Sequence, residues 1–171
     1  AKGPAARGLE DDAAVLALGD DTLVITHDTL VQGVHVREDE DPADIAWKLV
    51  AVNLSDLAAK GAEPVGVMLG YSLGANNTAF LKGLEAALTA FDVPLLGGDT
   101  VAVENTRTFS LTALGRATHT PVPSRSGARP GDHVWLSGSV GGAMMGFDAV
   151  NGWVDADERP FTRPTPRLAE G

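Results

Sequence analysis

Acidic residues stand at the ends of several short apolar segments, where the ligand sites of layered sheets are often found. They are Asp11, Asp12, Asp28 and Asp99. Carboxylate oxygens are the ligands that Mg²⁺ takes, together with retained water. Taken singly, each aspartate is more typical of a turn. Only the four together indicate a cation site.

A further carboxylate lies on a helix that the sequence predicts over residues 41–60. The segment is apolar nearly all round, which is typical of a buried helix. Asn53, Asp56 and Lys60 nevertheless share one narrow face, because three and four residues separate them. That face is either the solvated edge of the helix or part of a polar site. In a buried site the carboxylate needs a cation or hydrogen-bond donors.

The tetrapeptide GGDT at residues 97–100 allows a backbone to approach a phosphate closely. By itself it is a weak signal. The chain has no GxxxxGK[ST] sequence, which excludes a P-loop, and no protein-kinase glycine-rich loop or HRD sequence. The four histidines lack zinc-like spacing. His35 could face a ligand or lie in a surface loop, and Arg125 could reach a phosphate or lie in water.

Composition and charge limit the class of protein. With 171 residues, 44% of them hydrophobic and 5% aromatic, the chain is expected to form a core of Ala, Val and Leu. A net charge of −10 argues against a nucleic-acid or anionic-membrane surface, and it suits either bound metal ions or solubility alone. The absence of cysteine excludes disulfides and zinc–thiolate sites. No apolar run approaches the roughly 18 residues of a membrane span, so we expect a cytoplasmic protein.

Predicted strands and helices alternate along residues 1–118, which indicates an α/β or layered α+β domain. The expected elements are a hairpin of 14–18 and 22–26, strands at 65–73, 93–96 and 108–116, and helices at 41–60 and 76–91. Residues 119–131 are rich in Pro, Ser and Gly and are expected to link two domains. A strand at 133–137 and a helix at 143–150 then begin an incomplete second domain over residues 132–171.

Several strings in this order resemble thiamine-monophosphate kinases across nearly the whole chain. They are DDAAV (11–15), THDTLVQGVH (26–35), DPADIAWKLVAVNLSDLAAKGAEP (41–64), GGDT (97–100) and RSGARPGD (125–132). NLSDLAAKGAEP is the most specific. DDA and GGDT recur in the wider superfamily of aminoimidazole-ribonucleotide synthetase, selenophosphate synthetase and a hydrogenase-maturation factor.

The resemblance implies ATP-dependent phosphorylation of thiamine monophosphate to thiamine diphosphate by direct in-line transfer, with Mg²⁺ on the phosphates. It also implies the N-terminal domain of the aminoimidazole-ribonucleotide synthetase-like fold, a mixed sheet with flanking helices that pairs as a homodimer. Metal positions carried over from the family are Asp12, Thr26, His27, Asp28, Asp56 and Asp99, of which Asp28 and Asp99 are also catalytic. Nucleotide positions are Gly98, Asp99 and Arg125, and His35 is a substrate position.

The chain departs from the family pattern at three places. His27 stands where the family usually has Ser or Thr, and Gly142 stands where Asp is common. The tail 163–171 resembles a segment midway through the family's C-terminal domain, and the later Ser-Asp-Gly motif is absent, so the chain corresponds to a little over half of such an enzyme. The alternatives are another ATP-dependent enzyme of the superfamily or an inactive dimerising fragment.

Overall fold

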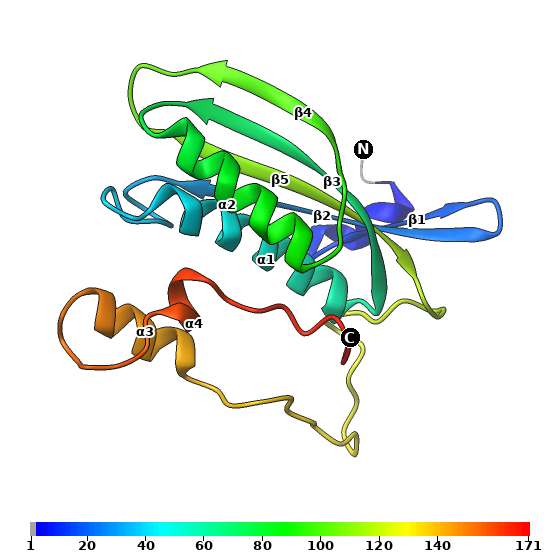
Figure 1. Ribbon diagram of the computed structural model, residues 1–171. Coiled ribbons are helices and arrows are strands. Elements are labelled where there is room, and N and C mark those ends of the chain that lie inside the picture. The colour runs from blue at the N-terminus through cyan, green and yellow to red at the C-terminus, as the bar shows by residue number, and fades with distance from the viewer. Residues whose placement is uncertain (1–2) are drawn as a thin grey trace.

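A computed structural model describes residues 3–171 of the chain. A five-stranded mixed sheet has the order β1-β2-β5-β3-β4, in which β3 and β4 are parallel and the other neighbours are antiparallel. The strands are β1 (Ala14–Leu18), β2 (Asp21–Val31), β3 (Ala62–Leu73), β4 (Leu95–Ala102) and β5 (Thr108–Ala117). Helices α1 (Pro42–Ala59) and α2 (Asn77–Ala90) cover one face of the sheet (Figure 1), and a 3₁₀ helix, η1 (Pro4–Leu9), precedes β1. The predicted mixed sheet with flanking helices is confirmed.

Side chains alternate between the two faces of the central strand β5. Phe109, Leu111 and Ala113 are buried, and the residues between them are less buried. Ala113 pairs with Thr26 and Leu111 pairs with Asp28 across the β2–β5 ladder. Since paired residues share a face, Thr26 and Asp28 point toward the helices.

Helix α1 begins where the sequence predicts. The Asp41 carboxylate accepts the N–H of Ala43 at 2.9 Å, and Pro42 occupies the first helical position. The helix ends at Ala59, and Gly61 follows with a φ of 57°, in the region that favours glycine.

The core contains more than the expected Ala, Val and Leu. Phe80 of α2 stacks on Phe109 of β5 with ring centroids 5.3 Å apart, and Tyr71 of β3 lies 4.5 Å from Phe80. The few aromatic residues therefore concentrate where the second helix meets the sheet.

Two strands that carry predicted site residues extend further than predicted. β4 runs from Leu95 to Ala102, so GGDT lies inside an edge strand rather than after one. β2 continues to Val31, so Asp28 lies within it. Glycine weakens a strand, but hydrogen bonding to a neighbouring strand overrides that local preference.

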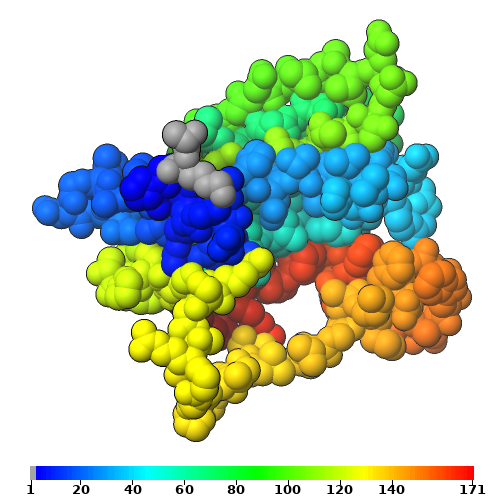
Figure 2. Space-filling model, turned by 180° about the vertical axis from the view of Figure 1, so that it is seen from behind, coloured from blue at the N-terminus to red at the C-terminus, as the bar shows by residue number. Residues whose placement is uncertain are grey.

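The predicted strand at 133–137 is wrong, because these residues adopt no regular structure. Val134 is 99% exposed and Trp135 is 90% exposed. A strand requires a neighbour to satisfy its backbone groups. This segment (yellow to orange in Figure 2) is separated by an opening from the C-terminal segment (red) that lies above it.

The segment after the sheet contains only two helices within the described residues, α3 (Gly142–Val150) and α4 (Arg159–Thr162). α3 confirms the helix predicted at 143–150. The boundaries 1–118, 119–131 and 132–171 stay predictions. Among residues 3–171, no helix has the length and apolar character needed to span a bilayer.

Candidate metal and nucleotide site

Three predicted ligand residues meet where α1 crosses β2. The Thr26 hydroxyl donates to a carboxylate oxygen of Asp56 at 2.9 Å. The backbone N–H of Asp28 donates to the side-chain oxygen of Asn53 at 3.2 Å, and the Asn53 amide in turn donates to the carbonyl of Leu49 at 2.9 Å. Asn53 is fully buried and Lys60 is 3% exposed, so the solvated-edge interpretation of this helix face is wrong.

Negative charge accumulates around Asp56. Burial raises the pKa of this carboxyl, the hydrogen bond from Thr26 lowers it, and the charges of Asp28 and Asp12 raise it further. The opposing effect of Lys60 is smaller, and the pKa ends above its ordinary value. A cation bound beside these carboxylates would relieve their repulsion.

The Asp11–Asp12 pair is held by basic side chains. Lys60 donates to Asp11 and lies 3.4 Å from Asp12, and Arg7 pairs with Asp11 at 2.9 Å. Burial opposes ionisation of Asp11, but the contacts with Lys60, the N–H of Asp12 and Arg7 together lower its pKa below the ordinary value. Asp11 is thus a buried, ionised partner of Lys60 and Arg7 and is not free to bind a metal ion.

Asp11, Asp12, Asp28 and Asp56 form an acidic cluster. Arg125 reaches this cluster from the predicted linker and pairs with Asp12. Arg7 fastens the same linker by donating to the carbonyls of Pro123 at 3.0 Å and Val122 at 3.2 Å. Arg7 is not among the residues predicted from the sequence, although its four-residue spacing from Asp11 is a signal that could have indicated it.

The donors suit a hard cation. Carboxylate and hydroxyl oxygens are ligands for Mg²⁺, which commonly takes one or two carboxylates and completes its shell with water and substrate phosphates. Among residues 3–171, no group of three or more acidic or histidine side chains is close enough to hold a metal by itself. Water and phosphate oxygens would supply the other ligands of a cation bound here.

Asp99 and Gly98 lie elsewhere in this chain. Asp99 pairs with Gly70, Gly70 with Ser110, and Ser110 with Thr29, so Asp99 shares a face with Thr29 and not with Asp28. These four residues lie in a row across β4, β3, β5 and β2. Three strand spacings, of about 4.8 Å each, therefore separate Asp99 from Thr29. The structure does not bring Asp99 to the other carboxylates.

Gly98 is required by its strand rather than by a turn. A side chain there would collide with the carbonyl of Leu69, and the residue has a φ of 155°. β4 is also the last strand of the described sheet, so one of its edges has no neighbouring strand there.

The two histidines carried over from the family also lie apart from the cluster. His27 points to the sheet face opposite the helices, where its Nδ1 lies 2.9 Å from the Thr112 hydroxyl. His35 is exposed in the loop after β2, and its Nδ1 accepts the N–H of Val31 at 3.1 Å. His27 is therefore not positioned to bind a cation with Asp28.

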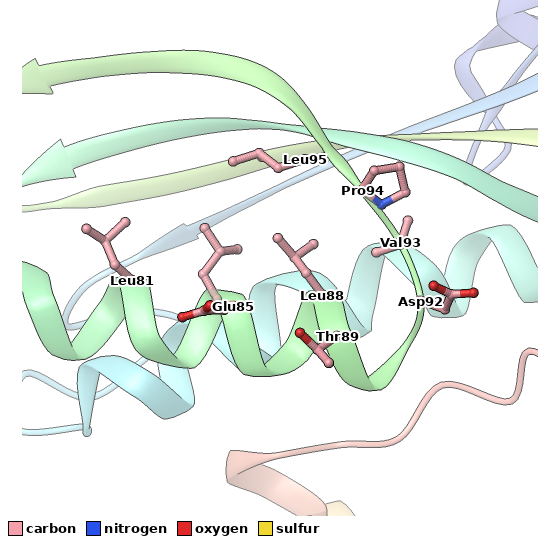
Figure 3. A pocket seen from close by; sticks show the side chains of 9 residues that line it. Leu81, Glu85, Leu88, Thr89, Asp92, Val93, Pro94 and Leu95 are labelled. Atoms are coloured by element: carbon pink, nitrogen blue, oxygen red, sulfur yellow. The ribbon is translucent and has the colours of Figure 1, made fainter.

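A groove of about 590 Å³ lies between α2 and the start of β4 (Figure 3), and Asp11, Asp12, Asp28 and Asp56 are not among its lining residues. Leucines of α2 and the Val93–Leu95 segment line it, with Glu85 and Asp92 among its polar residues. An apolar groove that carries two carboxylates does not suit a triphosphate.

The raised pKa of Asp56 predicts that Asp56→Asn stabilises the metal-free protein. A carboxyl whose pKa rises on folding favours the folded state fully below its ordinary value of 3.8, and that contribution is lost as the pH rises through the folded pKa. We expect the variant to unfold at a higher temperature than the parent at pH 7, with the difference shrinking toward about pH 4. Thermal unfolding followed by circular dichroism in EDTA measures this. Exposed Asp20→Asn is the control, and a lower unfolding temperature for Asp56→Asn at pH 7 contradicts the argument.

Residues 10–117 match the family described as AIR synthase related protein, N-terminal domain. The match covers more than half of the chain, and the chain belongs to this family. It is 44% identical over 176 residues to a thiamine-monophosphate kinase of Caulobacter vibrioides, covering 96% of this chain and 50% of that protein.

Solved structures agree with this family. The thiamine-monophosphate kinase from Stenotrophomonas maltophilia K279a superposes with a TM-score of 0.76 at 35% identity, covering 96% of this chain and 60% of the other. AaThiL complexed with AMPPCP and TMP gives a TM-score of 0.83 at 25% identity, covering 96% and 58%. The chain spans about half the length of the curated relatives it matches.

Proposed function

We propose that the protein is a thiamine-monophosphate kinase, which passes the γ-phosphate of ATP to thiamine monophosphate in the cytoplasm, and that this chain carries its cation-binding half. The observation that carries the proposal is the meeting of Thr26, Asp28 and Asp56 under α1, with Asp12 nearby. The likeness to the Caulobacter vibrioides kinase supports the same activity.

The residues of this chain act mainly by positioning. Asn53 fixes the backbone of Asp28, and Thr26 orients Asp56, so their carboxylates are arranged before a ligand arrives. Bound Mg²⁺ would neutralise phosphate charge in the in-line transfer. Asp12, Asp28, Asp56 and Thr26 would hold it.

Arg125 and His35 are assigned the remaining contacts in this proposal. Arg125 approaches the acidic cluster from the linker and pairs with Asp12, and its side chain is two-thirds exposed. A nucleotide phosphate can therefore replace Asp12 as its partner. His35 presents an exposed imidazole that is oriented by the N–H of Val31, and it would contact thiamine monophosphate.

A coupled assay of the protein with thiamine monophosphate, ATP and Mg²⁺ tests the activity. Formation of thiamine diphosphate supports the proposal, and the absence of this product overturns it. Competition binding separates the remaining classes. A superfamily enzyme with another acceptor binds ATP without recognising thiamine monophosphate, and an inactive dimerising fragment binds neither.

We further propose that the chain pairs with a second copy through the sheet face opposite the helices. Met68, Leu96 and Val101 are about half exposed on or beside this face (47%, 54% and 47%), and an apolar face of this kind typically marks an interaction surface. The pairing would also cover exposed side chains of β4.

Met68→Glu is expected to weaken dimerisation by about 30-fold or more, because the interface would bury an unpaired charge. Sedimentation over a concentration series measures the effect. The control is Leu81→Glu on α2, which is similarly exposed at 53% but lies on the helical side. A monomeric parent protein, or equal effects of both variants, contradicts this interface.

A further inference from the structure

Two buried lysines on or at the end of α1 differ in what they contact. Lys48 pairs with Glu40 at 2.5 Å, whereas Lys60 pairs with Asp11 and lies 3.4 Å from Asp12. Their side chains are 8% and 4% exposed. The proposed function uses Asp12 but gives Lys60 no role.

Different groups hold the two carboxylate oxygens of Asp12. Lys60 lies beside Oδ2 and Arg125 pairs with Oδ1. Asp11 Oδ1, which accepts from Lys60, also accepts the backbone N–H of Asp12 at 3.0 Å. Lys60 thus holds Asp12 both directly and through Asp11. Because its side chain is almost fully enclosed, this orientation is built into the fold.

We propose that Lys60 is a positioning residue that orients Asp12 for cation binding, an inference that rests on the proposed metal site. A free ammonium beside the site would repel a cation. Here Asp11 already pairs with that charge, which reduces the repulsion that Lys60 would exert on a cation. Residues that orient metal ligands commonly change metal affinity by about 10- to 100-fold when they are replaced.

Lys60→Met is expected to lower the affinity for Mn²⁺, a spectroscopic substitute for Mg²⁺, by about 10-fold or more. Electron paramagnetic resonance of free Mn²⁺ measures it, with and without a non-hydrolysable ATP analogue. Lys48→Met is the matched control, since it also removes one buried charge from α1 but touches no proposed ligand. Its Mn²⁺ affinity is expected to equal that of the parent.

A double variant separates orientation from stability. Lys60→Met leaves Asp11 buried without its main partner, which destabilises the fold. Adding Asp11→Asn removes that unpaired charge, so the double variant is expected to regain thermal stability while its Mn²⁺ affinity stays about 10-fold low. If Lys60→Met alone fails to fold, the Mn²⁺ affinity of the double variant is compared with that of the parent instead.

Three outcomes overturn the inference: unchanged Mn²⁺ affinity in Lys60→Met, higher affinity in that variant, or recovery of affinity together with stability in the double variant. A parent protein that binds no Mn²⁺ contradicts the metal site and the role of Lys60 together. If Lys60→Met binds Mn²⁺ more weakly but the parent protein does not phosphorylate thiamine monophosphate, only the proposed substrate is contradicted and the role of Lys60 stands.

Discussion

Asp99→Asn is expected to lower phosphoryl transfer by about 100-fold or more while leaving the fold intact. Asp99 is exposed on β4, and one of its oxygens accepts the N–H of the adjacent Thr100 at 2.9 Å, a bond that asparagine can keep. The loss would therefore come from the missing negative charge. Steady-state turnover and thermal unfolding of the variant measure the two effects. Glu104→Gln, in the exposed turn after β4, is the control. Unchanged turnover in Asp99→Asn refutes the metal-binding and catalytic role that the family resemblance implies for Asp99.

The location of Asp99 makes a further test decisive. Asp99 lies far from Asp28 within one chain and on the sheet face that the proposed dimer would cover, so we expect it to act in a site that is completed by a second copy. We expect Asp56→Asn, like Asp99→Asn, to be nearly inactive alone. Mixing the two variant chains should then restore activity, because one site of each mixed dimer has both native residues. If the two residues serve the same chain's site, the mixture stays inactive.

Phe80→Ala is expected to lower the free energy of unfolding by about 3–5 kcal/mol. Phe80 is fully buried, and its ring contacts Phe109 and Tyr71 where α2 meets the sheet. Removing the ring leaves a cavity that this rigid contact cannot close. Such a loss is a large part of the roughly 5–15 kcal/mol that stabilises a typical domain. Urea unfolding monitored by circular dichroism measures the change.

The neighbouring Leu81→Ala is the control for that experiment. Leu81 is 53% exposed on the same helix, so its replacement should change stability by only about 0.5 kcal/mol. Equal losses in the two variants would contradict the view that the aromatic cluster of Phe80 anchors α2.

Local chemistry in the sequence was enough to predict most elements of the sheet domain. Asp41 and Pro42 define the start of α1, and alternation defines β5, because capping and side-chain period act within a few residues. The spacing of Asn53, Asp56 and Lys60 likewise places them on one helix face, since the helical period alone decides which side chains are neighbours. The family strings predicted the mixed sheet.

The environment of each candidate residue was decided only by the tertiary structure. Whether the Asp56 face was solvated depended on β2 packing against α1, and the distance of Asp99 from Asp28 depended on strand order and on which face each side chain takes. Residues 133–137 have strand-like composition but no strand to pair with. Pairing across the sheet and burial against a helix join residues far apart in the chain, so no local pattern contains them.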